Sequence, residues 1–173
     1  MTHHDRVRLA PTGESGTAPS MYPDTSSEVG ADLQQVLVDL LDLGLLAKQV
    51  HWNVVGPRFR ALHLQLDEIT LAVRLQADAV AERAVTVGVA PDGRAATVSA
   101  GSRLMAGVPE GMPAGAIRDG VAIELVNTML TRTIDGLRTA ITSTTACDPV
   151  TEDLLIGVSA ELEKQRWMLI ASR

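Results

Sequence analysis

At 173 residues the chain has the size of one domain, and its 2% of aromatic residues leaves Leu, Val, Ile and Ala to fill the core, which favours helices. The net charge of -6 excludes a generally basic surface of the kind that binds nucleic-acid backbones. The single cysteine, Cys147, excludes an internal disulfide and a thiolate metal site, which is typical of a reducing compartment. No stretch approaches the ~18 apolar residues of a membrane span. We therefore expect a cytoplasmic protein.

The first segment, residues 1–25, mixes Pro, Gly, Ser and Thr without helical or strand periodicity and lacks the apolar block of a signal peptide. It predicts a flexible N-terminal arm, with the folded domain in residues 26–173. Ser26 or Ser27 can cap a first helix, which is expected to end near the Gly-Pro pair at 56–57. Apolar positions of this helix recur at steps of three and four, as on one buried face: Leu33, Leu37, Leu40, Gly44, Ala47 and His51.

A second helix is expected from about residue 58 to residue 88, about eight turns long. Its predicted buried stripe is Leu62, Leu66, Ile69, Val73, Val80, Ala84 and Val87. Residues 88–115 carry Gly and Pro repeatedly, which predicts an irregular crossover, although residues 98–107 favour a short helix.

A third helix is expected from about residue 113 to residue 144, and a fourth from Pro149 to the C-terminus with Asp148 as its cap. The third has a periodic apolar face: Ile117, Val121, Leu125, Met129 and Ile134. Two long helical pairs joined by a long middle connection predict an all-α, ferritin-like four-helix bundle with one crossover.

Side chains that can bind a metal are concentrated in one window: His51, His63, Asp67, Asp78 and Glu82. His63 and Asp67 are four residues apart, as are Asp78 and Glu82, so each pair presents two ligands on one helix face. The two aspartates lie on the same face but are roughly 16 Å apart along the axis, far beyond the ~2 Å reach of a metal–ligand bond. One chain therefore cannot bring the two pairs together.

Symmetry offers a way to join them, because the residue numbers in the pairs 63/82 and 67/78 both have the sum 145. If two copies of this helix cross antiparallel about a twofold axis, position i faces position 145 minus i of the other copy. His63 then meets the other chain's Glu82, Asp67 meets the other chain's Asp78, and two equivalent sites arise at one interface. His51, at the end of the preceding helix, can complete each site.

Imidazole and carboxylate ligands without thiolate suit Fe(II), Mn(II) or Zn(II), and a mixed nitrogen and oxygen set with open positions favours iron redox chemistry. For any single residue the simpler interpretation is a hydrogen-bonded core histidine or a solvated acid. Five ligand-type residues, four of which obey one symmetry relation, favour a site. Trp52 can trap radicals near a metal, but interface packing is the preferred interpretation. Arg83 is interpreted as a salt-bridge partner or an orienting group.

The segments HWNVVGPRFRALHLQLDE and DAVAERAVTVG carry the spacing His-x11-His-x3-Asp-x10-Asp-x3-Glu, and with it the chain resembles the Dps family of small ferritins over roughly residues 26–172. The resemblance implies a hollow homo-dodecamer that oxidises ferrous iron, preferably with hydrogen peroxide, and keeps non-haem ferric mineral inside. It implies a ferroxidase, with His51, His63 and Asp67 of one subunit and Asp78 and Glu82 of its twofold mate as the iron ligands and catalytic residues.

Some members of the family bind DNA through basic tails, but residues 1–25 carry two arginines against three acids, a net charge of -1, so the arm does not support strong DNA binding. The arm also holds His3 and His4, which can chelate Cu(II) or Ni(II), although idle histidines are the preferred interpretation. Two alternatives to the ferroxidase stay open. One is a nucleoid-associated, DNA-compacting protein with secondary iron binding, and the other is an ordinary helical bundle whose acids only form salt bridges.

Overall fold

A computed structural model of the chain describes residues 26–108 and 111–172. The predicted arm at 1–25 lies outside the described residues, and so do the side chains of Ser26 and Ser27, the predicted first caps.

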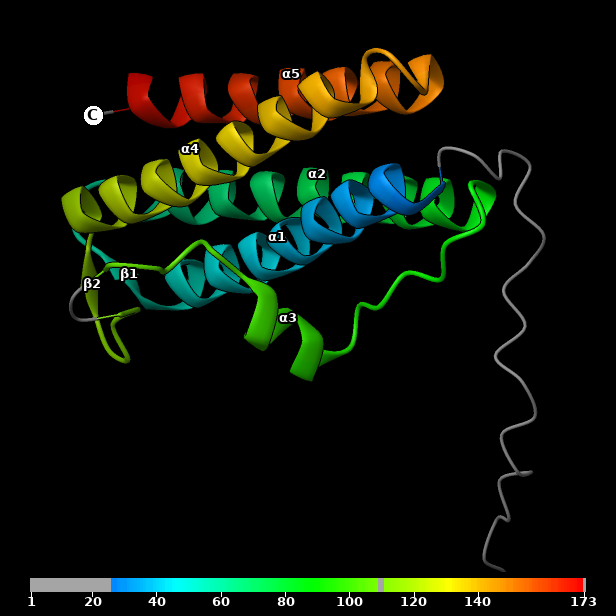
Figure 1. Cartoon of the computed structure of the whole chain (residues 1–173). Helices are drawn as coiled ribbons and strands as arrows, with labels where there is room; N and C mark the ends of the chain where they lie inside the picture. The colour runs from blue at the N-terminus through cyan, green and yellow to red at the C-terminus, as the bar shows by residue number, and fades with distance from the viewer. Residues whose placement is uncertain (1–25, 109–110, 173) are drawn as a thin grey trace, which may run out of the picture.

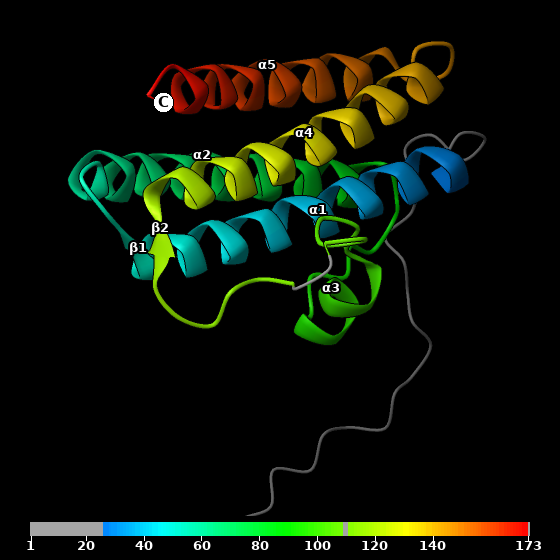
Figure 2. The same ribbon diagram turned by 90° about the vertical axis from the view of Figure 1, so that its left-hand side faces the viewer.

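Four long helices form two hairpins: α1 (Ser26–Asn53) with α2 (Phe59–Thr86), and α4 (Asp119–Thr144) with α5 (Pro149–Ala171) (Figure 1). The second hairpin packs on the first through α4 against α1 and α5 against α2. The short helix α3 (Ala95–Gly101) lies on the outer side of α1, away from α5, in both ribbon views (Figure 2). The all-α ferritin-like bundle predicted from the sequence is confirmed, and no helix in the described part of the chain is long and apolar enough to cross a membrane.

The apolar stripes predicted for the first two helices are buried at every position. Val73 packs beside Gly44, where a Cβ would lie 3.8 Å from Cγ1 of Val73, an ordinary van der Waals distance. Helix α5 begins as predicted: Pro149 occupies the first turn, and Asp148 accepts a hydrogen bond of 3.1 Å from the backbone N–H of Thr151.

The structure differs from the sequence prediction at three points. The third helix was expected from residue 113, but α4 begins at Asp119, because β2 (Ile117–Arg118) pairs in parallel with β1 (Val54–Val55) and keeps the chain extended there. Val121 was expected in the core, but it is 49% exposed, so that assignment was wrong. The short crossover helix begins three residues earlier than predicted and ends at Gly101.

Gly56 joins β1 to α2 in a conformation that requires glycine, with φ +130°. A Cβ at this position would lie 2.8 Å from Cγ of Asp119. The Asp119 carboxylate accepts hydrogen bonds from the Arg58 backbone N–H (3.2 Å) and from Arg58 Nε (3.0 Å), which ties the α1–α2 connection to the start of α4.

Candidate metal centre

Two histidines from α1 and α2 interlock where the first hairpin closes. The rings of His51 and His63 stack with their centroids 3.7 Å apart and their planes 20° from parallel. Nδ1 of His51 lies 2.8 Å from the backbone carbonyl oxygen of His63, and Nδ1 of His63 lies 3.0 Å from the carbonyl oxygen of His51. Because a carbonyl oxygen only accepts, each Nδ1 carries a proton, and Nε2 of each neutral ring keeps its lone pair for a metal.

Asp67 lies one turn after His63, with its Oδ1 3.6 Å from Nδ1 of His51. The Lys48 ammonium pairs with the same carboxylate oxygen. The hydrogen bond from Lys48 is the main cause that lowers the pKa of the Asp67 carboxyl below its usual value. A cation therefore already occupies one face of this ligand. Lys48 was not predicted as part of the site, although its position one turn before His51 on α1 was a signal that could have identified it.

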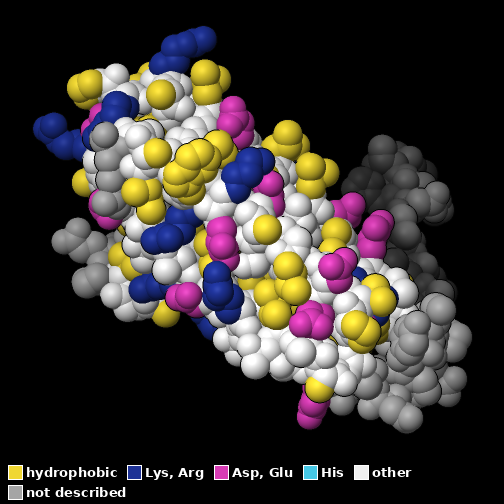
Figure 3. Space-filling model, turned by 90° about the horizontal axis from the view of Figure 1, so that it is seen from above, with side chains coloured by type: hydrophobic (Ala, Val, Ile, Leu, Met, Phe, Trp, Pro, Cys, Tyr) yellow, Lys and Arg dark blue, Asp and Glu magenta, His cyan; other side chains and the backbone are white. Residues whose placement is uncertain are grey.

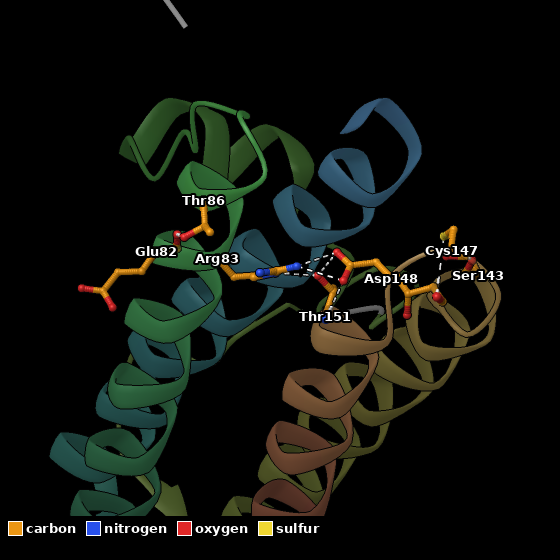
Figure 4. A network of polar contacts seen from close by, with 8 residues as sticks. Glu82, Arg83, Thr86, Ser143, Cys147, Asp148 and Thr151 are labelled. Carbon is orange, nitrogen blue, oxygen red and sulfur yellow. Dashed lines mark hydrogen bonds and ion pairs between the residues drawn. The ribbon is translucent and has the colours of Figure 1, made fainter. Parts of the chain in front are cut away.

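Asp78 and Glu82, the other two predicted ligands, lie farther along α2 and are exposed. Figure 4 shows that Glu82 points out of the bundle, on the side of α2 opposite to Arg83. Within the described residues of one chain, no group of three or more His, Cys, Asp or Glu side chains is arranged to hold a metal ion. The structure thus brings His51, His63 and Asp67 together and leaves the two acids apart from them, so the completed five-ligand site stays a prediction.

The outer face of α2 has a palindromic spacing. Eight positions on this face are separated by steps of three and four residues, and they form four pairs whose residue numbers each have the sum 145. All are exposed except the half-buried His63: Arg60, His63, Asp67, Leu71, Arg74, Asp78, Glu82 and Val85. Two apolar side chains at the middle of this face, Leu71 and Leu75, are each 63% exposed, and Trp52 beside the site is 69% exposed. Exposed apolar side chains that gather in this way mark a surface suited to contact with another protein.

Arg83 has the salt-bridge role predicted from the sequence. Its Nη2 lies 2.9 and 2.8 Å from the two carboxylate oxygens of Asp148, and its Nε donates to the Thr151 hydroxyl at 2.8 Å (Figure 4). This largely buried pair fixes the last turns of α2 against the start of α5. Because Glu82 precedes Arg83 on the same helix, the pair also sets the direction in which Glu82 leaves the bundle.

The face of the molecule formed by α4 and α5 shows no continuous basic surface in its described part. Figure 3 shows Lys and Arg side chains interspersed with Asp, Glu and apolar groups on this face. Ion pairs account for part of the mixture, such as Arg138 with Glu163 and Lys164 with Glu161. This face therefore lacks the clustered positive charge that phosphate backbones select.

Comparison with known proteins identifies the family of the chain and several relatives. The profile of the family described as "Ferritin-like domain" matches residues 30–171. The "DNA protection during starvation protein" of Mycolicibacterium smegmatis is 35% identical over 159 residues, which span 91% of this chain and 83% of that protein. The "Fine tangled pili major subunit" of Haemophilus ducreyi is 34% identical over 155 residues, 90% of this chain and 79% of that protein.

Among solved structures, Dps from Microbacterium arborescens in its high iron form superposes with a TM-score of 0.83 at 27% identity, over 90% of this chain and 98% of that one. The profile match over most of the chain, the relatives above 30% identity and the shared architecture lead to one conclusion. The chain belongs to the Dps family of ferritin-like proteins.

Proposed function

We propose that this protein is a ferroxidase and iron store whose oxidation site is shared between two copies of the chain. Membership of the ferritin-like Dps family supports a general role in iron storage and DNA protection. The observation that carries the finer proposal is the interlocked histidine pair, because both Nδ1 atoms are committed to backbone carbonyls while both Nε2 atoms stay available. Histidines that serve packing alone do not require two adjacent rings that both bind a backbone carbonyl through Nδ1 and both leave Nε2 unbonded.

The second half of the proposed site comes from the palindromic face of α2. A twofold axis between residues 72 and 73 places Asp78 of the partner subunit opposite Asp67 and Glu82 of the partner subunit opposite His63. Each site then holds two imidazoles and three carboxylates, a set of ligands that suits Fe(II). The exposed leucines at the centre of the same face support the pairing, since a second copy would bury them.

Hydrogen peroxide is the proposed oxidant. Two Fe(II) ions each give one electron to one peroxide molecule, its O–O bond breaks, and two protons complete two waters. Because the reductants act as a pair, the reaction bypasses the hydroxyl radical that a single Fe(II) ion releases from peroxide. Ferric ions then hydrolyse and are stored in the cavity of a closed homo-dodecamer, as the resemblance to the family implies.

A reassembly experiment tests the shared site. The first variant carries His63→Ala with Asp67→Ala, and the second carries Asp78→Ala with Glu82→Ala. Each alone is expected to lose Fe(II) oxidation, since every site in its homodimer lacks one of the two halves. A mixed dimer holds one site with none of the four groups and one site with all of them, so mixing the variants should restore activity.

With random pairing about half the dimers are mixed, and each keeps one of its two sites, so roughly a quarter of the wild-type rate is expected if the sites act independently. Circular dichroism first establishes that both variants are helical, and mass spectrometry establishes that they co-assemble. Folded, co-assembled variants that stay inactive would refute the shared site. A site built within one chain predicts the same lack of recovery.

A further inference from the structure

Arg74 stands at the midpoint of the outer face of α2. It is exposed and lines a largely apolar hollow between α1, α2 and α3, beside Leu41, Leu45 and Ala77. Within the described residues its guanidinium makes no hydrogen bond or ion pair. An exposed guanidinium without a protein partner is hydrated, so any surface that covers Arg74 must supply acceptors for its five donors in place of water.

Helix geometry places Arg74 on the same flank of α2 as two of the proposed ligands. At about 100° per residue, Asp67 and Asp78 project within about 40° of Arg74, whereas Glu68, the other acid nearby, projects about 120° away. Asp78 is one turn further on, a rise of about 6 Å. A guanidinium on a long side chain can reach across that distance.

The shared site of the proposed function, on which this inference rests, brings a second acid to the same place. In that pairing position 74 faces position 71, and Asp78 faces Asp67 of the partner subunit. Each Arg74 therefore lies one turn from a site, next to the twofold axis and between the two sites. A second copy that covers Leu71 and Leu75 would also take Arg74 out of water, and a buried guanidinium without an acidic partner costs free energy.

We propose that Arg74 provides a positive charge at the interface between the two subunits. It holds the carboxylates of the two subunits together when the site contains no iron, and it repels the ferrous ion that binds there. The unloaded site has three carboxylates, from Asp67, Asp78 and Glu82, against the single charge of Lys48. Arg74 adds a second positive charge. A divalent ion must then bind against the field of that charge, so Arg74 favours assembly and lowers metal affinity at the same time.

The two effects predict opposite results for one substitution, Arg74→Gln. In chelator, sedimentation should show subunits that associate about tenfold more weakly, because repulsion between carboxylates is no longer offset. In a titration followed by the visible absorption of Co(II), a redox-inert probe, the assembled variant should bind about tenfold more tightly. That factor is expected for removing one charge at ~7 Å from a divalent ion in surroundings close to water.

Two further variants make the test specific. Arg74→Lys keeps the charge and should stay near wild type in both measurements. Lys164→Gln removes the same charge from an exposed position on α5, where the lysine pairs with Glu161, and should change neither. Circular dichroism confirms that each variant folds.

Arg74→Gln with association and Co(II) affinity within twofold of wild type would overturn the inference. Weaker association without tighter Co(II) binding would also overturn it, because that result describes a residue that serves packing alone. Wild-type protein that binds no Co(II), or a reassembly experiment without recovery, would overturn the proposed function. A recovered shared site with an inert Arg74 would overturn the present inference alone.

Discussion

Replacing Asp148 by alanine removes one partner from the best-defined ion pair of the structure. The carboxylate caps α5, accepts two hydrogen bonds from Arg83 Nη2 and one of 2.6 Å from the Thr151 hydroxyl, and both charged side chains are nearly buried, at 10% and 12% exposure. Loss of the cap costs about 1 kcal/mol. Leaving Arg83 uncompensated brings the expected total to about 3–5 kcal/mol of unfolding free energy.

Urea unfolding followed by circular dichroism measures this loss, with subunit concentration held constant because assembly contributes to apparent stability. A double-mutant cycle with Arg83→Met separates the pair from the cap. Once Arg83 is gone, Asp148→Ala should cost much less, since no buried charge is left unpaired. A loss below about 1 kcal/mol for Asp148→Ala alone, or costs that simply add in the double variant, would refute the reasoning.

The same carboxylate makes the stability depend on pH. Burial raises the pKa of Asp148, but the hydrogen bonds from Thr151 and Arg83 together outweigh it, so the pKa lies below its ordinary value. The folded state therefore binds the proton less readily than the unfolded state. The contribution of Asp148 is present above the unfolded pKa of about 3.9 and is lost as pH falls through the lower folded pKa. Acid unfolding of the double variant should lack this component.

Further predictions concern the site and its partners. Lys48→Gln should bind Co(II) roughly severalfold more tightly, because the ion no longer displaces an ammonium from Asp67, and weaker binding in a titration would contradict this. Peroxide consumption should approach one molecule per two Fe(II), and hydroxyl radical trapped at the level of a protein-free control would exclude the paired oxidation. In a gel shift at physiological salt we expect no retained DNA complex, and a tight complex lost on deletion of residues 1–25 would show that the arm binds phosphate despite its charge.

The sequence by itself determined the four long helices and, for the first two, the positions of their buried faces. Spacing of three and four residues is a local property of the chain. The periodic apolar positions between Leu33 and Ala47, and those between Leu62 and Val87, could therefore be assigned to the core before any packing was known. The Asp148 cap and Pro149 were predictable for the same reason, since a helix start depends on a few consecutive residues. The proposed ligands were also visible in the sequence, because helical spacing relates their directions.

The tertiary structure decided what depends on segments far apart in the chain. Because β2 pairs with β1 over two residues, α4 begins only at Asp119. The sequence of residues 113–118 alone does not predict this pairing with a strand about 60 residues earlier in the chain. The mutual hydrogen bonds of His51 and His63, the contact of Lys48 with Asp67 and the pairing of Arg83 with Asp148 all join different helices. Periodicity states which way a side chain points from its own helix. The neighbour that it meets is set by how the helices pack, because hydrogen-bond partners depend on distances and angles between whole elements.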